Sequence, residues 1–394
     1  MKKLKYFIPI LLFAILAISC KKETNAYIDA NAPAPAQVSN IKVEATPGGA
    51  IITYKIPVDK NILYVKAVYE IQPGIFREAK SIFYKDTLAL VGFGDTLSHE
   101  VKLYSIGKNE KESGVIPISV KPLMPPVRSV METVTFESTF GGVVVEFKNI
   151  HQADLSIVVL MDTTGHNSWA PVTTYYTAAL AGKFATHGLD SIERRFAVFV
   201  RDRWNNKSDT LIKSLKPLYE MLIPWKPFVA YHLPNDFWTG ENATHTLEKA
   251  FDGIVNVSED VFATKDFLTR PQWWTLDLHQ NVVFSRMKLY QRTSYPYSGV
   301  WVKSFEIWGS NAPAADGSWD SWQLLGDFNS IKPSGLPGLA YTANDMVFAT
   351  AGEEFIFPQP IPAVRYLRFK FKDSYGGTGQ YHIGELTFWG QLVP

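Results

Sequence analysis

Five side chains suited to holding a sugar lie in polar, turn-forming segments of the last part of the chain. A sugar ring has an apolar C–H face and many hydroxyls, so its binding site needs an exposed aromatic ring beside hydrogen-bonding groups. Segments rich in Gly, Pro and Asn form surface loops, where binding residues concentrate. The alternative is that these rings only pack the loops onto the domain. The candidate ligand-binding residues are Trp238, Arg292, Tyr295, Tyr297 and Tyr375.

Sequence motifs of enzymes are incomplete or missing. His99-Glu100 begins an HExxH motif, but Leu103 stands where the second zinc-binding histidine is required. The sequence contains no G-x-S-x-G motif, no P-loop and no dinucleotide-binding glycine pattern after a strand. A glycosidase would need only two carboxylates, which can come from distant loops. No sequence motif singles out such a pair here. The sequence therefore predicts a protein that is not an enzyme, with a glycosidase as the weaker alternative.

Composition excludes further classes of protein. The 394 residues carry 39 basic and 38 acidic side chains, so no strong field attracts nucleic acid. Cys20 is the single cysteine, which excludes an intramolecular disulfide and a thiolate zinc cluster. Hydrophobic residues make up 46% of the chain, enough for packed cores. The length predicts roughly two to four domains.

The first 36 residues are expected to form a targeting signal followed by a tether. Three lysines precede an apolar run over residues 6–18, which is shorter than the about 20 residues that a spanning helix needs. The sequence Leu-Ala-Ile-Ser-Cys at residues 16–20 resembles a bacterial lipobox. That resemblance implies a signal peptide over 1–19 and lipidation of Cys20. Residues 20–36 are polar with alternating Pro and Ala, which predicts an extended tether.

An internal repeat follows the tether. Apolar and polar residues alternate with period two in both copies, for example over 50–56 and 143–147, which predicts strands. The segment 103–113 aligns with 198–208 at an offset of 95, and each is followed by Lys-Pro-Leu. The strand–polar turn–strand pattern resembles the last hairpin of fibronectin type III modules. We therefore expect two fibronectin III-like or immunoglobulin-like sandwiches, at 37–122 and 127–216. The linker over 217–227 is apolar, so we expect it to be packed.

A third unit covers residues 230–394. Its signatures, in order, are AFDG at 250–253, WWTLDL at 273–278, SFEIWGSN at 304–311 and HIGELTFWG at 382–390. This order resembles the discoidin, or F5/8 type C, domain, which includes family 32 carbohydrate-binding modules. The whole chain is thus expected to be all-β, with two sandwiches followed by a discoidin-like β jelly roll. Four tryptophans in the strand signatures are expected in its core: Trp274, Trp308, Trp322 and Trp389.

The discoidin resemblance also implies a metal. Modules of the carbohydrate-binding kind hold a structural Ca²⁺ beside AFDG, and the matching residues are Asp252 and Glu385. Carboxylate and carbonyl oxygens are the donors that Ca²⁺ prefers. The sequence departs from the family at Ile254, where a polar residue is usual. The alternative is that Asp252 caps a turn and Glu385 pairs with a basic residue.

The combination of a lipobox, two sandwiches and a discoidin domain resembles surface lipoproteins of Bacteroidetes polysaccharide-utilisation loci. The resemblance implies a non-catalytic protein at the cell surface, lipid-anchored in the outer membrane, that captures polysaccharide or oligosaccharide through its C-terminal domain. It also implies an outer-membrane glycan importer complex as partner and contact with the membrane through the lipid anchor only. The alternative is a protein–protein interaction scaffold in which the sandwiches are spacers and no sugar is bound.

Overall fold

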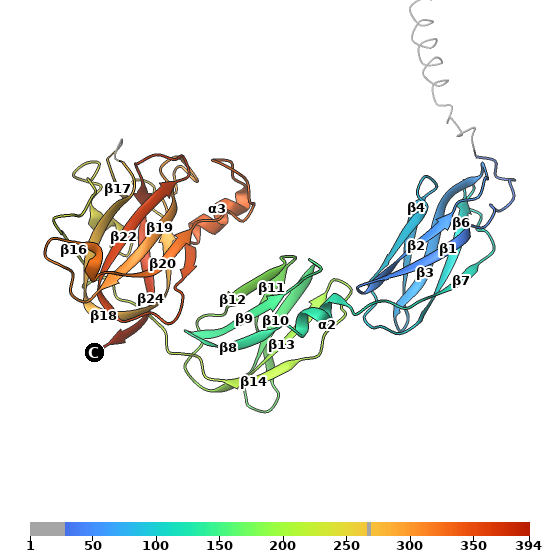
Figure 1. Ribbon diagram of the computed structural model, residues 1–394, viewed down its shortest axis with the longest axis horizontal. Helices are drawn as coiled ribbons and strands as arrows, with labels where there is room; N and C mark the ends of the chain where they lie inside the picture. The colour runs from blue at the N-terminus through green and yellow to red at the C-terminus, as the bar shows by residue number, and fades with distance from the viewer. Residues whose placement is uncertain (1–27, 266–268) are drawn as a thin grey trace, which may run out of the picture. The chain divides into compact units, whose positions relative to one another are not determined.

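The computed structural model describes residues 28–265 and 269–394, and β-strands make up almost all of their regular structure (Figure 1). The α-helices in these ranges are α2 (Pro126–Met131) and α3 (Ala343–Thr350). None of the described helices has the length and apolarity needed to cross a membrane. The expected signal peptide, Cys20 and the start of the tether lie outside the described residues. The prediction of an all-β fold is confirmed.

The first repeat is a sandwich of a three-stranded sheet, β1-β2-β5, and a four-stranded sheet, β4-β3-β6-β7. Its period-two pattern places one side of each strand in the core: in β3 the buried residues include Val65, Ala67 and Tyr69. The strands are β1 (Ser39–Thr46), β2 (Gly49–Lys55), β3 (Ile62–Gln72), β4 (Ile75–Ile82), β5 (Thr87–Val91), β6 (His99–Gly107) and β7 (Ile116–Val120).

The second repeat has the same set of sheets. One sheet has the order β11-β10-β13-β14, and the other has the order β12-β9-β8. Helix α2 precedes the first of these strands. The strands are β8 (Thr135–Thr139), β9 (Gly142–Lys148), β10 (Leu155–Asp162), β11 (Trp169–Thr177), β12 (Ala181–Ala185), β13 (Arg194–Asp202) and β14 (Leu211–Leu215).

Equivalent hydrogen bonds confirm the internal repeat. Ser113 Oγ accepts a bond from Ser105 N at 2.9 Å, and 95 residues later Ser208 Oγ accepts one from Val200 N at 2.9 Å. The leucine of the Lys-Pro-Leu motif also makes an equivalent backbone hydrogen bond in both repeats. Leu123 O accepts from Gly48 N, and Leu218 O accepts from Gly141 N. In each repeat, the leucine three residues beyond the last strand is therefore hydrogen-bonded back to the glycine that precedes the second strand.

The third unit is built around one long strand, β18 (Gln272–Tyr290). Its first half pairs with β22 and β16, and its second half pairs with β24 and β21. A register irregularity between Asp277 and Val282 lets the strand change partners. The elements are β15 (Met221–Leu222), β16 (Val229–Tyr231), η1 (Leu247–Ala250), β17 (Phe262–Ala263), β19 (Val302–Ser310), η2 (Trp319–Ser321), β20 (Gln323–Asn329), β21 (Glu353–Ile356), β22 (Val364–Ser374), β23 (His382–Ile383) and β24 (Glu385–Val393).

Aromatic rings fill the core of this jelly roll, but two of the four expected tryptophans lie outside it. Trp274 is fully buried and stacks on Phe369 with ring centroids 5.0 Å apart. Trp322 is buried as well. Trp308 and Trp389 are only half-buried, because alternation along the strands puts them on the face opposite the core. Cations cover both rings: Lys370 lies over Trp308, and Arg286 lies over Trp389.

The apolar linker before the jelly roll is packed, as predicted. Met221 and Leu222 form strand β15 and pair with Gly390 and Trp389 of β24. Glu220 accepts hydrogen bonds from the Arg286 guanidinium and from Ser285 Oγ. The linker is thus an edge strand of the jelly-roll sheet.

Candidate functional site

The exposed Tyr295 and the largely buried Arg292 form an aromatic–arginine pair just after β18. The Arg292 Nε donates to Ser258 O at 2.6 Å and to Ser294 Oγ at 2.8 Å, and its Nη2 donates to Glu259. These bonds fix the guanidinium, whose carbon lies 5.0 Å from the centre of the Tyr295 ring. Tyr295 itself is 61% exposed. A ring that is held in place but free on one face is what a stacked sugar requires.

Polar residues from two other segments gather around this pair. In the loop after Trp238, His245 Nδ1 lies 2.6 Å from Glu241 Oε2, and Gln380 Nε2 donates to Glu241 Oε1 at 3.3 Å. His382 lies within electrostatic reach of Glu241, His245 and Arg292. Carboxylate, imidazole, amide and guanidinium groups therefore meet at one end of the jelly roll, and together they both donate and accept hydrogen bonds.

His382 is the buried member of this polar cluster. It is 4% exposed, and neither ring nitrogen has a hydrogen-bond partner in the described ranges. Burial, and then the charge of Arg292, lower its pKa to about 4. The imidazole is therefore neutral near pH 7, with one nitrogen able to donate and the other able to accept.

Tyr297 and Tyr375 belong to a different, internal cluster. Tyr297 is 1% exposed, and its hydroxyl donates to Asp345 O at 3.3 Å. Its ring packs edge-on against Tyr375, with ring centroids 5.2 Å apart, and lies tilted against Trp301 at 4.7 Å. This burial contradicts the expectation that Tyr297 is an exposed platform. Tyr375 is half-buried, and its hydroxyl is hydrogen-bonded to Ser330, so it mainly holds the internal cluster.

Trp238 is a packing residue at the edge of the core. It is half-buried, meets the Phe262 ring edge-on at 5.5 Å and lies nearly parallel to His232 at 6.0 Å. Its loop contributes to the polar cluster through Glu241 and His245 instead. The polar run Gly240–His245 (GENATH) was the sequence signal for those residues.

Asp252 and Glu385, the expected calcium ligands, are adjacent at a separate place. Glu385 is 1% exposed, and its Oε2 accepts from the backbone N–H groups of Asp252 and Gly253, each at 3.1 Å. Burial, with a contribution from the Asp252 charge, raises the pKa of Glu385 to about 8. The Asp252 Oδ2 lies 3.6 Å from Lys249 Nζ. Lys249 is shared with Asp260, and among the described residues Glu385 has no ion-pair partner. The site fits a cation in this respect, because a bound cation would supply the charge that Glu385 lacks.

Three family models match the chain in tandem. They cover residues 35–122 (DUF4959), 123–226 (DUF5126) and 251–390 (DUF5000), and each is described as a domain of unknown function. No curated protein matches the chain.

Several solved structures are similar to parts of the chain. The family 32 carbohydrate-binding module of C. perfringens NanJ in complex with galactose is 19% identical, covering 43% of this chain and 98% of its own, with a TM-score of 0.31. The C-terminal domain of a chitobiase from Bacteroides fragilis is 15% identical, covering 44% and 100%, with a TM-score of 0.32. A SusE-like protein is 34% identical, covering 68% of this chain and 100% of its own, with a TM-score of 0.45. Identity at that level over the whole of the solved SusE-like protein means that the chain belongs to the SusE-like family.

Proposed function

We propose that this protein captures polysaccharide at the bacterial cell surface, without cleaving it, through the loops at one end of its C-terminal jelly roll. The observation that carries the proposal is the exposed Tyr295 ring beside the fixed Arg292 guanidinium. Membership of the SusE-like family supports it. The partner in the cell would be an outer-membrane glycan importer complex.

The polar cluster suits a sugar for a chemical reason. Tyr295 would cover the C–H face of one ring, while the Arg292 guanidinium, whose Nε and Nη2 are already engaged, would donate to a neighbouring hydroxyl from Nη1. Glu241, whose side chain is 36% exposed, can accept hydrogen bonds from hydroxyls. A hydroxyl needs both kinds of partner, and the cluster provides both within one loop region.

Tyr295→Ala is expected to weaken glycan affinity about tenfold. Stacking buries roughly 60 Å² of apolar surface, which at about 25 cal/mol per Å² is worth on the order of 1.5 kcal/mol. Because the ring is 61% exposed, the melting temperature should stay unchanged. Calorimetric titration against a polysaccharide panel measures the affinity. Tyr84→Ala, which removes an 80% exposed tyrosine from the first sandwich, is the control and should bind normally. Equal affinity of the two variants would place the sugar elsewhere.

Lipidation of Cys20 would hold the protein at the outer membrane. Each buried CH₂ of an acyl chain contributes about 0.8 kcal/mol, so several chains anchor firmly. We expect Cys20→Ala to move the protein from the detergent-extractable membrane fraction to the soluble fraction, as followed by immunoblotting of fractionated cells. Cys20 is the only cysteine, so no other thiol can take over the anchor. A variant that stays in the membrane fraction would refute the lipid anchor.

Calcium binding between Asp252 and Glu385 is proposed as a structural contribution. Ca²⁺ takes six to eight oxygens, so the two carboxylates would supply part of its shell, and the rest would come from carbonyls and water. A cation that binds only the folded state stabilises it by mass action. Addition of EDTA should therefore lower the melting temperature of the purified protein, and Asp252→Asn should remove that response. An EDTA-insensitive melting curve, with no calcium in elemental analysis, would exclude the ion.

A further inference from the structure

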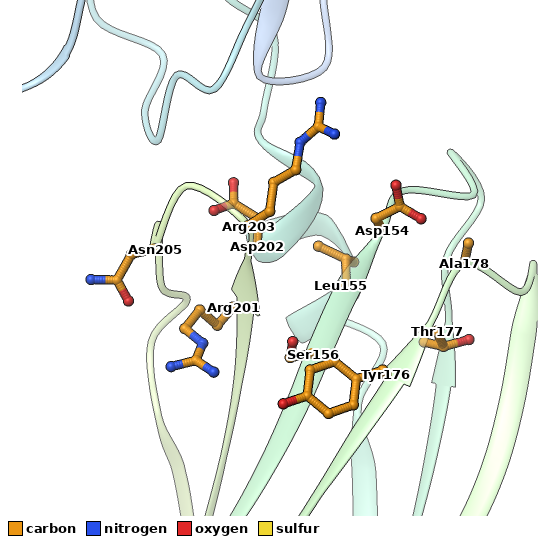
Figure 2. Close-up of a pocket in the computed structure, with 10 residues that line it drawn as sticks. All are labelled: Asp154, Leu155, Ser156, Tyr176, Thr177, Ala178, Arg201, Asp202, Arg203 and Asn205. Atoms are coloured by element: carbon orange, nitrogen blue, oxygen red, sulfur yellow. The ribbon is translucent and has the colours of Figure 1, made fainter. Parts of the chain in front are cut away.

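A polar cleft of about 630 Å³ opens on the second sandwich, outside the jelly roll (Figure 2). It lies on the four-stranded sheet, where β10, β11 and β13 run side by side. None of the residues expected from the sequence to bind a ligand lines it. The lining side chains used below are Asp154, Ser156, Tyr176, Arg201 and Asn205.

Three of these residues form one row across the sheet. Ser156 of β10 pairs directly with Tyr176 of β11 on one side and with Arg201 of β13 on the other. Directly paired residues of antiparallel strands point to the same face, with Cβ atoms about 5 Å apart. The aromatic ring and the guanidinium therefore rise on either side of a small serine (Figure 2). The small central residue leaves a notch between the two large ones.

The groups around this notch are available to a ligand. Tyr176 is 72% exposed. Across residues 28–265 and 269–394, the Arg201 guanidinium and the Asp154 carboxylate have no hydrogen-bond or ion-pair partner. Two other charged residues at the rim are already engaged. Asp202 accepts from the backbone of its own turn, and the Arg203 guanidinium lies 4.4 Å from the Trp204 ring centre.

The charges identify the class of ligand. Arg201 can only donate hydrogen bonds, and Asp154 can only accept them. A cationic ligand would be repelled by Arg201 and an anionic one by Asp154, whereas sugar hydroxyls satisfy both. Tyr176 supplies the ring for an apolar sugar face. On the basis of the proposed function, we propose that this cleft is a second carbohydrate-binding site, which takes a neutral pyranose unit of the polysaccharide on Tyr176 between Arg201 and Asp154.

A second site changes how the protein holds a polymer. When one chain binds two positions of the same polysaccharide, the second binding event becomes intramolecular, and the overall affinity exceeds that of either site. A short oligosaccharide that fills only one site gains nothing from this. A glycan long enough to reach both sites would therefore bind more tightly than a short one.

The test measures both sites in the full chain. Amylopectin, xylan, galactan, mannan and mucin oligosaccharides are titrated calorimetrically into the unaltered protein, Tyr176→Ala, Tyr295→Ala and the double variant. We expect Tyr176→Ala to weaken binding about tenfold and the double variant to bind more weakly than either single one. Tyr176→Phe keeps the ring and should bind normally, and Tyr84→Ala is the exposed-tyrosine control.

The outcomes separate this inference from the proposed function. If Tyr295→Ala abolishes binding and Tyr176→Ala has no effect, the second site is overturned and the jelly-roll site stands. If only Tyr176→Ala weakens binding, the second site stands and the jelly-roll site is wrong. If the unaltered protein binds none of the five glycans, both are overturned. Because the Tyr176 ring projects into solvent, a lower melting temperature of Tyr176→Ala would assign it a packing role and also overturn the inference.

Discussion

Arg368→Ala is expected to lower the free energy of unfolding of the C-terminal jelly roll by about 3–5 kcal/mol. Arg368 lies in β22 and is fully buried. Its guanidinium donates to Thr275 Oγ1 and Gly317 O at 3.1 Å, and to Asn235 Oδ1 and Asp236 Oδ1 at 3.2 Å. Removing it would leave the Asp236 carboxylate, whose side chain is 5% exposed, without its buried counter-charge.

Aromatic packing adds to the cost of that substitution. The guanidinium carbon lies 4.5 Å from the Trp319 ring centre and 4.2 Å from that of Trp322. Alanine would therefore also open a cavity between two indole rings, which lose their dispersion contacts. The arginine connects β22, β18 and the loops that carry Asn235 and Gly317. Its loss should loosen this whole side of the jelly roll.

Urea unfolding followed by tryptophan fluorescence would measure the effect, because eight of the eleven tryptophans lie in residues 230–394. Lys372→Ala is the control. That lysine is on the same strand, but its side chain is 29% exposed and its nearer ion-pair partner, Asp327, is 49% exposed, so its loss should cost about 0–1 kcal/mol. The double variant Arg368→Ala/Asp236→Asn should be more stable than Arg368→Ala alone, because it no longer leaves an unpaired buried carboxylate. A loss below about 1 kcal/mol in Arg368→Ala would show that the buried pair is not stabilising.

Local sequence patterns predicted the strands and the repeat but not which face of a strand is covered. Alternation correctly put Trp274 on the buried face of β18. In β19 the same alternation separates Trp308 from Ile307, and Trp308 lies outside the core under Lys370. An aromatic residue in a strand was therefore not a sufficient sign of burial. A long cation on the neighbouring strand can shield a tryptophan on the outer face.

The candidate site was predicted only where its residues are neighbours in the sequence. Arg292 and Tyr295 share one loop, so their proximity follows from the chain itself. Glu241, Gln380 and His382 come from segments about 140 residues apart, and only the closure of the jelly roll brings them together. Likewise, Tyr176 and Arg201 meet because β11 and β13 both pair with β10. Non-local strand pairing was the information that the sequence patterns lacked.

The internal cluster of the jelly roll should make its stability depend on pH through Glu353. This side chain begins β21, is 8% exposed, and accepts hydrogen bonds from Ser330 Oγ and Ile331 N. Within the described ranges it pairs with no cation. The neighbouring Lys332 donates instead to the carbonyls of Gly338 and Ala340. Burial therefore raises the pKa of Glu353 to about 7, despite the two hydrogen bonds.

The sign of the effect follows from proton binding. The folded pKa of about 7 exceeds the ordinary value of 4.5, so between these two values the folded state binds more protons than the unfolded state. The free energy of unfolding then falls as pH rises through this window, by about 3 kcal/mol at most, since one pKa unit corresponds to about 1.36 kcal/mol. Glu353→Gln keeps an acceptor for Ile331 N but carries no charge. We expect this variant to match the unaltered protein at pH 5 and to be more stable at pH 8.

Urea unfolding of both proteins at pH 5 and pH 8 would check this, and the difference between them isolates Glu353 from other titrating groups. Glu306→Gln is a comparison variant at a carboxylate whose pKa the folded protein lowers instead of raising. Burial opposes ionisation of Glu306, but a hydrogen bond and the charge of Lys370 outweigh it and hold its pKa below the usual value. Its charge is therefore stabilising, and its loss should reduce stability at pH 8. If Glu353→Gln is no more stable than the unaltered protein at pH 8, the buried carboxylate must be stabilised in its charged form by a group that moves toward it.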